Sequence, residues 1–230
     1  MGIQESLAKR RTYYNINKEL PVAEKEVVAL VENTTELVPD AFNMKSARVI
    51  VVTKAKQDAL WDAIYEAFGG KVAREKIDSF KAGYGTLLYF YDEDVVKGLQ
   101  EQFPLYAANF PIWAQQANGM LQISIWTALR ELNIGANLQH YNPVIDETVK
   151  KMFSVPDSWK LIAQMQRTRK TSRPASRSLA ESCIFMVFIG TSNKKLRSMR
   201  IAAELFVERT APVGSCFRAS RLLPTAAPHR

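Results

Sequence analysis

The sequence predicts an α+β fold. Three short segments rich in branched and aromatic residues have the composition of buried strands: RVIVV (48–52), GTLLYFYD (85–92) and WKLIAQM (159–165). Segments with apolar residues at helical spacing separate them, and no strand–helix unit repeats regularly along the chain. This irregular succession favours layers of helix and sheet over a doubly wound parallel sheet.

Helices are predicted before and between these strands. A short helix is expected over residues 3–10, and apolar residues at helical spacing predict a longer one over 22–37, with Pro21 at its entry. The same pattern predicts helices over 57–68 and 72–81.

The longest helical pattern runs from about residue 105 to 132, with Pro111 near its start. It is apolar on most sides, yet it carries four amide side chains: Gln115, Gln116, Asn118 and Gln122. We therefore expect a central helix that is partly buried against another protein surface.

The chain after this helix contains a turn, an extended piece and one more helix. The segment NIGANLQHY (133–141) reads as the turn and extended piece, and NPVIDETVKKMF (142–153) as the helix. Asn142 is its expected cap, Pro143 lies in its expected first turn, and two lysines lie at its negative end.

Charge divides the chain near residue 165. Through Met165 there are 18 Lys and Arg against 20 Asp and Glu, and afterwards 13 against 3, so the net charge of +8 comes from the tail. The tail also lacks Asp, Trp and Tyr. We expect residues 1–165 to form the functional domain and 166–230 to be a basic, atypical tail, either disordered or translated out of frame.

Several classes of protein are disfavoured by what the sequence lacks. It has no GxGxxG and no GxxxxGK[ST], and its patterned region has one histidine, His140, and no cysteine. These absences argue against common nucleotide loops, a multi-histidine metal site and thiol catalysis. No apolar run reaches the length of a membrane span and the start lacks a signal-peptide pattern, so we expect a cytoplasmic protein without metal.

Three polar loops are the candidate binding elements. KRRTYY (9–14) offers two adjacent arginines, which suit a phosphate. NMKSAR (43–48) places an amide and cations at the entrance of a buried strand, and ANLQHY (136–141) places polar groups between two helices. Each loop by itself is also compatible with an ordinary solvated turn.

Taken together, the loops and their order resemble the nitroreductase family over roughly residues 3–165. The resemblance rests on RRTYY, AFNMKSARVIVV, GANLQHYNP after a long helix, and WKLIAQM. It implies a three-layer α+β fold with a mixed or antiparallel central sheet flanked by helices, and a long central helix at the interface of a homodimer. It also implies FMN as cofactor, with NADH or NADPH as reductant and nitroaromatics, quinones or similar acceptors reduced by a ping-pong route. The flavin then carries the chemistry, so no catalytic side chain is required.

The resemblance also implies which residues contact the flavin. Arg10 and Arg11 would hold the phosphate with Thr12 and Tyr14 beside them, and the loop from Asn137 to His140 would lie against the flavin ring. The full set is Arg10, Arg11, Thr12, Tyr14, Asn43, Lys45, Arg48, Asn137, Leu138, Gln139 and His140.

The chain departs from the family pattern at two places. Lys45 stands where the family more often has Gln, and the chain continues after Met165 with QRTRKTSRPASRS, where the family usually has PFG and then a segment that crosses the dimer. We interpret the second departure as a shift of reading frame near Gln166. Two alternatives stay open. The first is a nucleic-acid-binding protein that uses the basic tail, which the absence of Tyr and Trp from the tail and of a recognised binding fold disfavours. The second is a defective, non-enzymatic homologue that lacks the segment crossing the dimer and folds poorly or binds FMN weakly.

Overall fold

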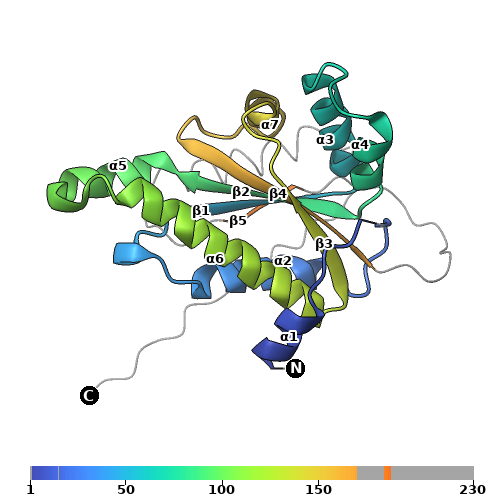
Figure 1. Cartoon of the computed structure of the whole chain (residues 1–230), viewed down its shortest axis with the longest axis horizontal. Helices are drawn as coiled ribbons and strands as arrows, with labels where there is room; N and C mark the ends of the chain where they lie inside the picture. The colour runs from blue at the N-terminus through green and yellow to red at the C-terminus, as the bar shows by residue number, and fades with distance from the viewer. Residues whose placement is uncertain (1, 15, 170–183, 188–230) are drawn as a thin grey trace, which may run out of the picture. The chain divides into compact units, whose positions relative to one another are not determined.

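The chain forms a five-stranded sheet with helices on both faces (Figure 1). The computed structural model describes residues 2–14, 16–169 and 184–187. The strands lie in the order β3-β4-β2-β1-β5, and every pair of neighbours is antiparallel. The predicted α+β class is thereby confirmed.

All three predicted strands form. They are β1 (Ala47–Thr53), β2 (Gly85–Asp92) and β4 (Trp159–Arg169), and the extended piece after the long helix forms β3 (Ile134–Gln139). β4 runs past Met165, so the strand crosses the boundary expected from composition. A four-residue strand from the tail, β5 (Ile184–Val187), pairs with β1. The other residues beyond Arg169, and with them most of the tail, lie outside the described residues.

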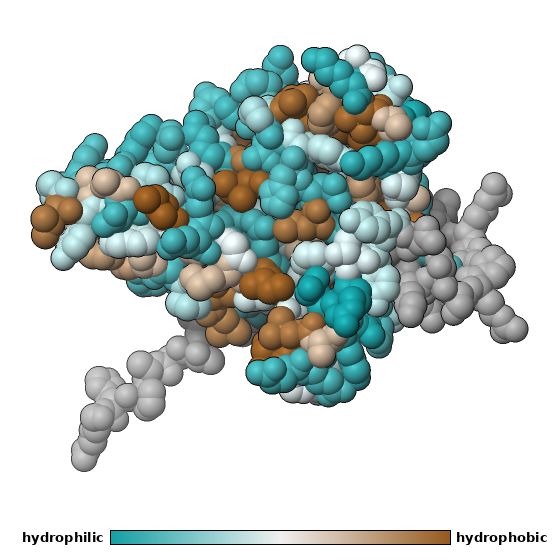
Figure 2. Space-filling view, in the orientation of Figure 1, coloured by the Kyte–Doolittle hydropathy of each residue, from teal (hydrophilic) through white to brown (hydrophobic). Residues whose placement is uncertain are grey.

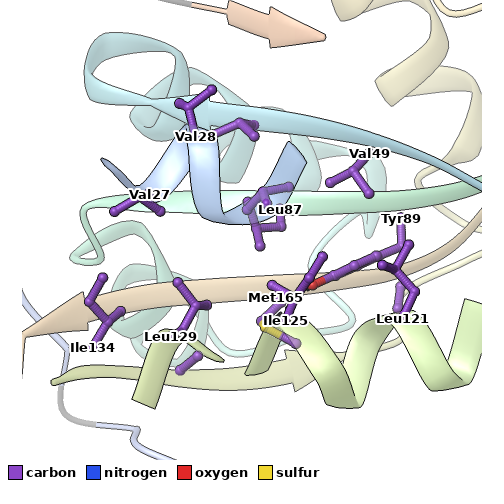
Figure 3. Close-up of a cluster of buried hydrophobic side chains, with 14 of the residues drawn as sticks. Val27, Val28, Val49, Leu87, Tyr89, Leu121, Ile125, Leu129, Ile134 and Met165 are labelled. Atoms are coloured by element: carbon purple, nitrogen blue, oxygen red, sulfur yellow. Dashed lines mark hydrogen bonds between the residues drawn. The ribbon is translucent and has the colours of Figure 1, made fainter. Parts of the chain in front are cut away.

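One face of the sheet is covered by α2 (Glu24–Leu37) and α6 (Phe110–Glu131) (Figure 1). Their apolar faces meet alternate residues of the strands, because side chains alternate between the two faces of a sheet. Figure 3 shows this cluster, in which the side chains of α6 point toward those of the central strands. Its members include Val27, Val31, Val49, Leu87, Leu121, Ile125, Leu129 and Met165.

The opposite face is covered by α3 (Lys54–Ala67), α4 (Arg74–Lys81) and α7 (Asp146–Phe153) (Figure 1). The other set of alternating strand residues, such as Ile50 and Leu88, packs there. The core on this side contains large aromatic side chains, including Trp61, Phe80, Phe90 and Trp159. The result is the predicted arrangement of helix, sheet and helix.

The long helix begins later than its apolar pattern predicts. Residues Pro104–Tyr106 form a separate 3-10 turn after α5 (Glu93–Gln102), and α6 starts at Phe110. Pro111 lies in the first turn of α6, where its missing N–H breaks no helical hydrogen bond. Pro111 therefore marks the start of the helix and does not interrupt it.

The four amides of α6 divide between two environments. Asn118 and Gln122 are buried, and Asn118 Nδ2 donates to the carbonyl of Phe90 at 3.0 Å while Gln122 Nε2 donates to Asn118 Oδ1 at 2.7 Å. Gln115 and Gln116 are exposed. Only the second pair lies on a face that another protein could cover.

The predicted cap of the last helix is wrong. The peptide bond between Asn142 and Pro143 is cis, and α7 begins three residues later, at Asp146. Asn142 instead donates its side-chain amide to the carbonyl of Leu161 at 3.2 Å. It therefore ties the loop to β4. The lysines expected at the negative end of this helix, Lys150 and Lys151, do lie in its last turn.

α1 (Ile3–Lys9) packs against the C-terminal part of α6 (Figure 1), and the hydroxyl of Ser6 donates to Glu131 at 2.6 Å. Among the described residues, no helix is both long enough and apolar enough to cross a membrane.

Candidate functional site

The structure brings together two of the three candidate loops. The segment after α1 runs beside β3: the amide of Tyr13 donates to the carbonyl of Ala136 at 3.1 Å, and Asn137 Nδ2 donates to the carbonyl of Tyr13 at 2.9 Å. The Tyr13 ring lies against Gly135, where an added Cβ would be 2.9 Å from the ring. Gly135 is therefore needed for the close approach of the two segments.

Arg10 and Arg11 lie at the end of α1 in different environments. The Arg10 guanidinium lies 4.4 Å from the centre of the Trp126 ring on α6, and its buried Nε has no hydrogen-bond partner within the described structure. Arg11 is exposed and donates to the carbonyls of Ala8 at 2.5 Å and Arg10 at 2.8 Å. The Trp126 ring holds the Arg10 guanidinium in place, while the Arg11 side chain is open to solvent.

The remaining candidates of this group differ in exposure. Thr12 and Tyr14 are exposed, and His140 is exposed at the end of β3. Leu138 packs partly against the core, and Gln139 Nε2 donates to Asn137 Oδ1 at 3.2 Å. Asn137 is fully buried, and its hydrogen bond to the carbonyl of Tyr13 joins β3 to the segment after α1.

Asn43 and Lys45 line a separate cavity of about 240 Å³. Its walls come from the C-terminal end of α2, the loop before β1 and the middle of α6. They comprise Thr35, Glu36, Leu37, Val38, Pro39, Asp40, Asn43, Lys45, Ala47, Ala117 and Leu121. The cavity is lined by one cation, two carboxylates, an amide and several apolar groups.

The backbone of the cavity loop is unusual. Phe42, Asn43 and Lys45 have φ values of 57°, 49° and 51°, in the left-handed region that residues with a Cβ seldom adopt. Hydrogen bonds fix the end of the loop: the Ser46 amide donates to Asp40 Oδ2 at 3.3 Å, and the Asp92 amide donates to the Ser46 carbonyl at 2.8 Å. Met44, between Asn43 and Lys45, is right-handed, and left-handed backbone at three such closely spaced positions persists only where surrounding contacts hold it.

Arg48 lies apart from the cavity. Its neighbour in β1, Ala47, lines the cavity, and Arg48 points to the other face of the sheet, where its guanidinium lies 5.7 Å from the Trp159 ring. Nη1 donates to the carbonyls of Lys45 at 2.8 Å and Ala47 at 2.9 Å, and Nη2 donates to Asp92 Oδ2 at 3.1 Å. Burial lowers the Arg48 pKa, and the nearby Asp92 carboxylate opposes that shift.

The two groups of candidates meet α6 at different heights. Arg10 rests on Trp126, whereas the cavity with Lys45 reaches Ala117 and Leu121. With 1.5 Å of rise per residue, these contacts are about 8 to 14 Å apart along the helix axis. Within one chain, the two arginines that suit a phosphate, Arg10 and Arg11, and the cavity are therefore separate sites.

The sequence analysis did not identify the residues that hold Arg10 and the cavity loop in place. Trp126 contacts Arg10 although the two residues are far apart in the sequence, and Asp40 holds the cavity loop by accepting from the amide of Ser46, six residues later. The left-handed backbone at Phe42, Asn43 and Lys45 could not be predicted from a glycine either, since none of the three residues is Gly. Among the described residues, no group of three His, Cys, Asp or Glu could hold a metal ion.

Comparison with known proteins gives a consistent result. Residues 7–166 match the nitroreductase family. The chain is 32% identical over 182 residues to nitroreductase FRM2 of Saccharomyces cerevisiae, a match that covers 78% of this chain and 93% of that protein.

Solved structures are similar over nearly the same extent. The nitroreductase CinD from Lactococcus lactis, solved in complex with chloramphenicol, is 40% identical with a TM-score of 0.71, covering 78% of this chain and 95% of that one. A nitroreductase from Saccharomyces cerevisiae is 32% identical with a TM-score of 0.66, covering 73% and 95%.

Proposed function

Because this chain belongs to the nitroreductase family and is therefore an oxidoreductase, we propose that it uses FMN to pass electrons from NADH or NADPH to nitroaromatics, quinones or similar acceptors. The observation that carries the proposal is the pair of adjacent arginines at the end of α1. One is fixed on Trp126 with an unpartnered Nε, and the other is exposed. Such a pair suits a phosphate dianion.

The neighbouring residues fit the rest of the cofactor. Thr12 and Tyr14 are exposed beside the arginines and can reach a phosphate or ribityl oxygen. The end of β3, from Leu138 to His140, offers polar groups for the edge of the flavin ring. Asn43 and Lys45 line a cavity that can take the polar edge of an isoalloxazine.

In this proposal the protein binds and orients, and bound FMN supplies the two-electron chemistry. Lys45 places a positive charge where the pyrimidine edge would lie, and the backbone groups of Leu138 to His140 fix the ring. No nucleophile or general base is required from the chain. The reductant and the acceptor would use the same exposed side of the site in turn, which is a ping-pong order.

Relatives support the choice of acceptor class. CinD has also been solved in complex with 4-nitrophenol, a nitroaromatic, and with nicotinic acid, which shares its ring with the nicotinamide cofactors. A protein of the same fold from Exiguobacterium sibiricum, 11% identical with a TM-score of 0.59, is in complex with FMN. We extend these ligand classes to this chain as part of the proposal.

We propose further that the working form is a homodimer. The exposed side of α6 carries Ile112, Met120 and Ile123, and an added Cβ at Gly119 would meet nothing within 4 Å. Figure 2 shows apolar side chains among the hydrophilic surface over α6. A second copy packed on this face would cover them, and it could bring its cavity loop to the arginines of the first copy. This would unite the two groups, whose contacts with α6 are about 8 to 14 Å apart along the helix axis in one chain.

The first test is the visible absorption spectrum of the purified full-length protein, before and after addition of NADH without air. Flavin bands that bleach on reduction are expected. A colourless protein that also fails to take up added FMN would contradict the proposal and favour the alternative of a non-enzymatic homologue.

Lys45 gives a second test, which concerns the flavin potential. A cation near the pyrimidine edge favours the reduced anionic flavin, so Lys45→Gln should lower the midpoint potential. The potential is measured by equilibrium reduction against a reference dye. An unchanged potential would place Lys45 away from the flavin.

A further inference from the structure

We propose that Arg48 is a positioning residue of the flavin site: without touching the cofactor, it holds the left-handed backbone that places Asn43 and Lys45 at the cavity. This inference rests on the proposed function. It assigns to Arg48 a different role from the direct flavin contact that the family resemblance implies.

The loop needs an external restraint. Phe42, Asn43 and Lys45 all have positive φ, which is less stable for a residue with a Cβ than an ordinary backbone conformation. No glycine occurs between Asp40 and Arg48 to relieve this cost. Unless other contacts hold it, the loop will move to conformations that aim Asn43 and Lys45 elsewhere.

Arg48 supplies that restraint from the opposite face of the sheet. Its Nη1 lies 2.8 Å from the carbonyl of Lys45, one of the left-handed residues, and 2.9 Å from the carbonyl of Ala47. The side chain is 1% exposed, so water competes little for these hydrogen bonds. Charged donors make the stronger hydrogen bonds, and a guanidinium can serve two carbonyls and a carboxylate at once.

Asp92 completes the restraint. Its carboxylate accepts from Arg48 Nη2 at 3.1 Å and from the amide of Asp94 at 3.2 Å, which caps α5. Its own amide donates to the carbonyl of Ser46 at 2.8 Å. Arg48 and Asp92 therefore hold the cavity loop at three backbone carbonyls, those of Lys45, Ser46 and Ala47. Through Asp92 the loop is attached to the end of β2 and the start of α5.

The test measures FMN dissociation constants, by quenching of flavin fluorescence, for the full-length protein and its variants. Arg48→Lys keeps the charge but loses the forked donors, and Arg48→Met loses both. We expect each to weaken FMN binding tenfold or more. Arg74→Met is the matched control: Arg74 also forms carboxylate pairs, but on the exposed surface of α4, and its loss should change binding less than twofold.

A double-mutant cycle with Lys45→Gln separates positioning from general stability. If Arg48 acts through Lys45, the effect of Lys45→Gln on FMN affinity and on the flavin potential should largely disappear in the Arg48→Met background. The unfolding midpoint of each FMN-free variant shows whether it is folded. If Arg48→Met does not fold, Arg48→Lys and the pair Arg48→Met/Asp92→Asn, which leaves no unpaired charge, take its place.

The outcomes distinguish the two proposals. Wild-type protein that does not bind FMN overturns the proposed function, and this inference with it. Wild-type protein that binds FMN, together with folded Arg48 variants that bind within twofold of it, overturns the positioning role alone. An undiminished effect of Lys45→Gln in the Arg48→Met background would also overturn it.

Discussion

Among the described residues, two arginines are almost completely buried, and they are held very differently. Arg48, in β1, donates through Nη1 and Nη2 to two carbonyls and to Asp92, and only its Nε has no partner. Arg167, near the end of β4, is 0% exposed, and its Nε, Nη1 and Nη2 have no hydrogen-bond partner within the described structure. Its favourable neighbours are the Glu24 carboxylate, which attracts the charge, and the Tyr84 ring, whose centre is 6.0 Å from the guanidinium carbon.

Two glutamines of β4 show a smaller difference. Gln164 Oε1 accepts from the amide of Tyr141 at 2.9 Å although its Nε2 has no partner, whereas neither polar side-chain atom of Gln166 has a partner in the described part of the chain. Buried polar groups are nearly always paired in proteins, because an unpaired one keeps the full cost of leaving water. The side chains of Gln166 and Arg167 therefore suit this core less well than that of Gln164.

This difference supports a change of reading frame near Gln166, which remains a prediction. The strand can continue past Met165 because backbone hydrogen bonds do not depend on the side chain, whereas core packing does. Translating the gene in the other two frames tests it. Absence of a PFG-like continuation in either frame would contradict the frameshift.

The largest effect should come from Arg48→Met. Removing one partner of a buried ion pair leaves the Asp92 carboxylate and two carbonyls unpaired, so we expect a loss of about 3–5 kcal/mol in the free energy of unfolding. Urea unfolding followed by circular dichroism measures it. A loss below about 1 kcal/mol would show that Arg48 contributes no more than an exposed ion pair.

Arg167→Met should have the opposite sign. It replaces a buried cation that has no hydrogen-bond partner in the described structure with an apolar side chain of similar length, and we expect a gain of roughly 1–4 kcal/mol in unfolding free energy. The same urea titration applies. Destabilisation would show that the attraction of Glu24 and the Tyr84 ring for the charge outweighs the cost of its burial, and would weaken the frameshift interpretation.

The gain from Arg167→Met should depend on pH. Burial lowers the Arg167 pKa to about 10, below its value in the unfolded chain, so the cost of burying the charge applies in full below pH 10. Above pH 10 the folded state releases this proton while the unfolded state keeps it, and the stability of the wild type rises relative to the variant. The difference between their unfolding midpoints should therefore shrink as pH rises from 9 to 11. A constant difference would contradict the assigned pKa direction.

The smallest effect is expected from Arg74→Met. Arg74 pairs with Asp62 and Asp78 at 2.8 Å each, but its side chain is 40% exposed and water screens both pairs. We expect little or no change in the unfolding midpoint, measured in the same experiment. A loss as large as that of Arg48→Met would show that burial does not distinguish these arginines.

The sequence determined the elements of this fold because local patterns carry them. Branched and aromatic runs gave β1, β2 and most of β4, and helical spacing gave α2, α3, α4 and α6 to within a few residues of their bounds. The exceptions have local physical causes. α6 starts beside Pro111, later than the apolar pattern predicts. The side chain of Asn142 donates to the carbonyl of Leu161 in β4 and does not cap α7.

The sequence also identified the candidate site residues, through their family resemblance, but not how they are arranged. Only the tertiary structure placed Arg10 on Trp126, and it alone turned Arg48 away from the cavity and onto the carbonyl of Lys45. Composition marked a boundary at Met165, whereas the structure showed a strand that crosses it with unpaired Gln166 and Arg167 side chains. Spacing along a chain fixes which residues share a helix or strand face, while contacts between residues dozens of positions apart depend on how the layers pack.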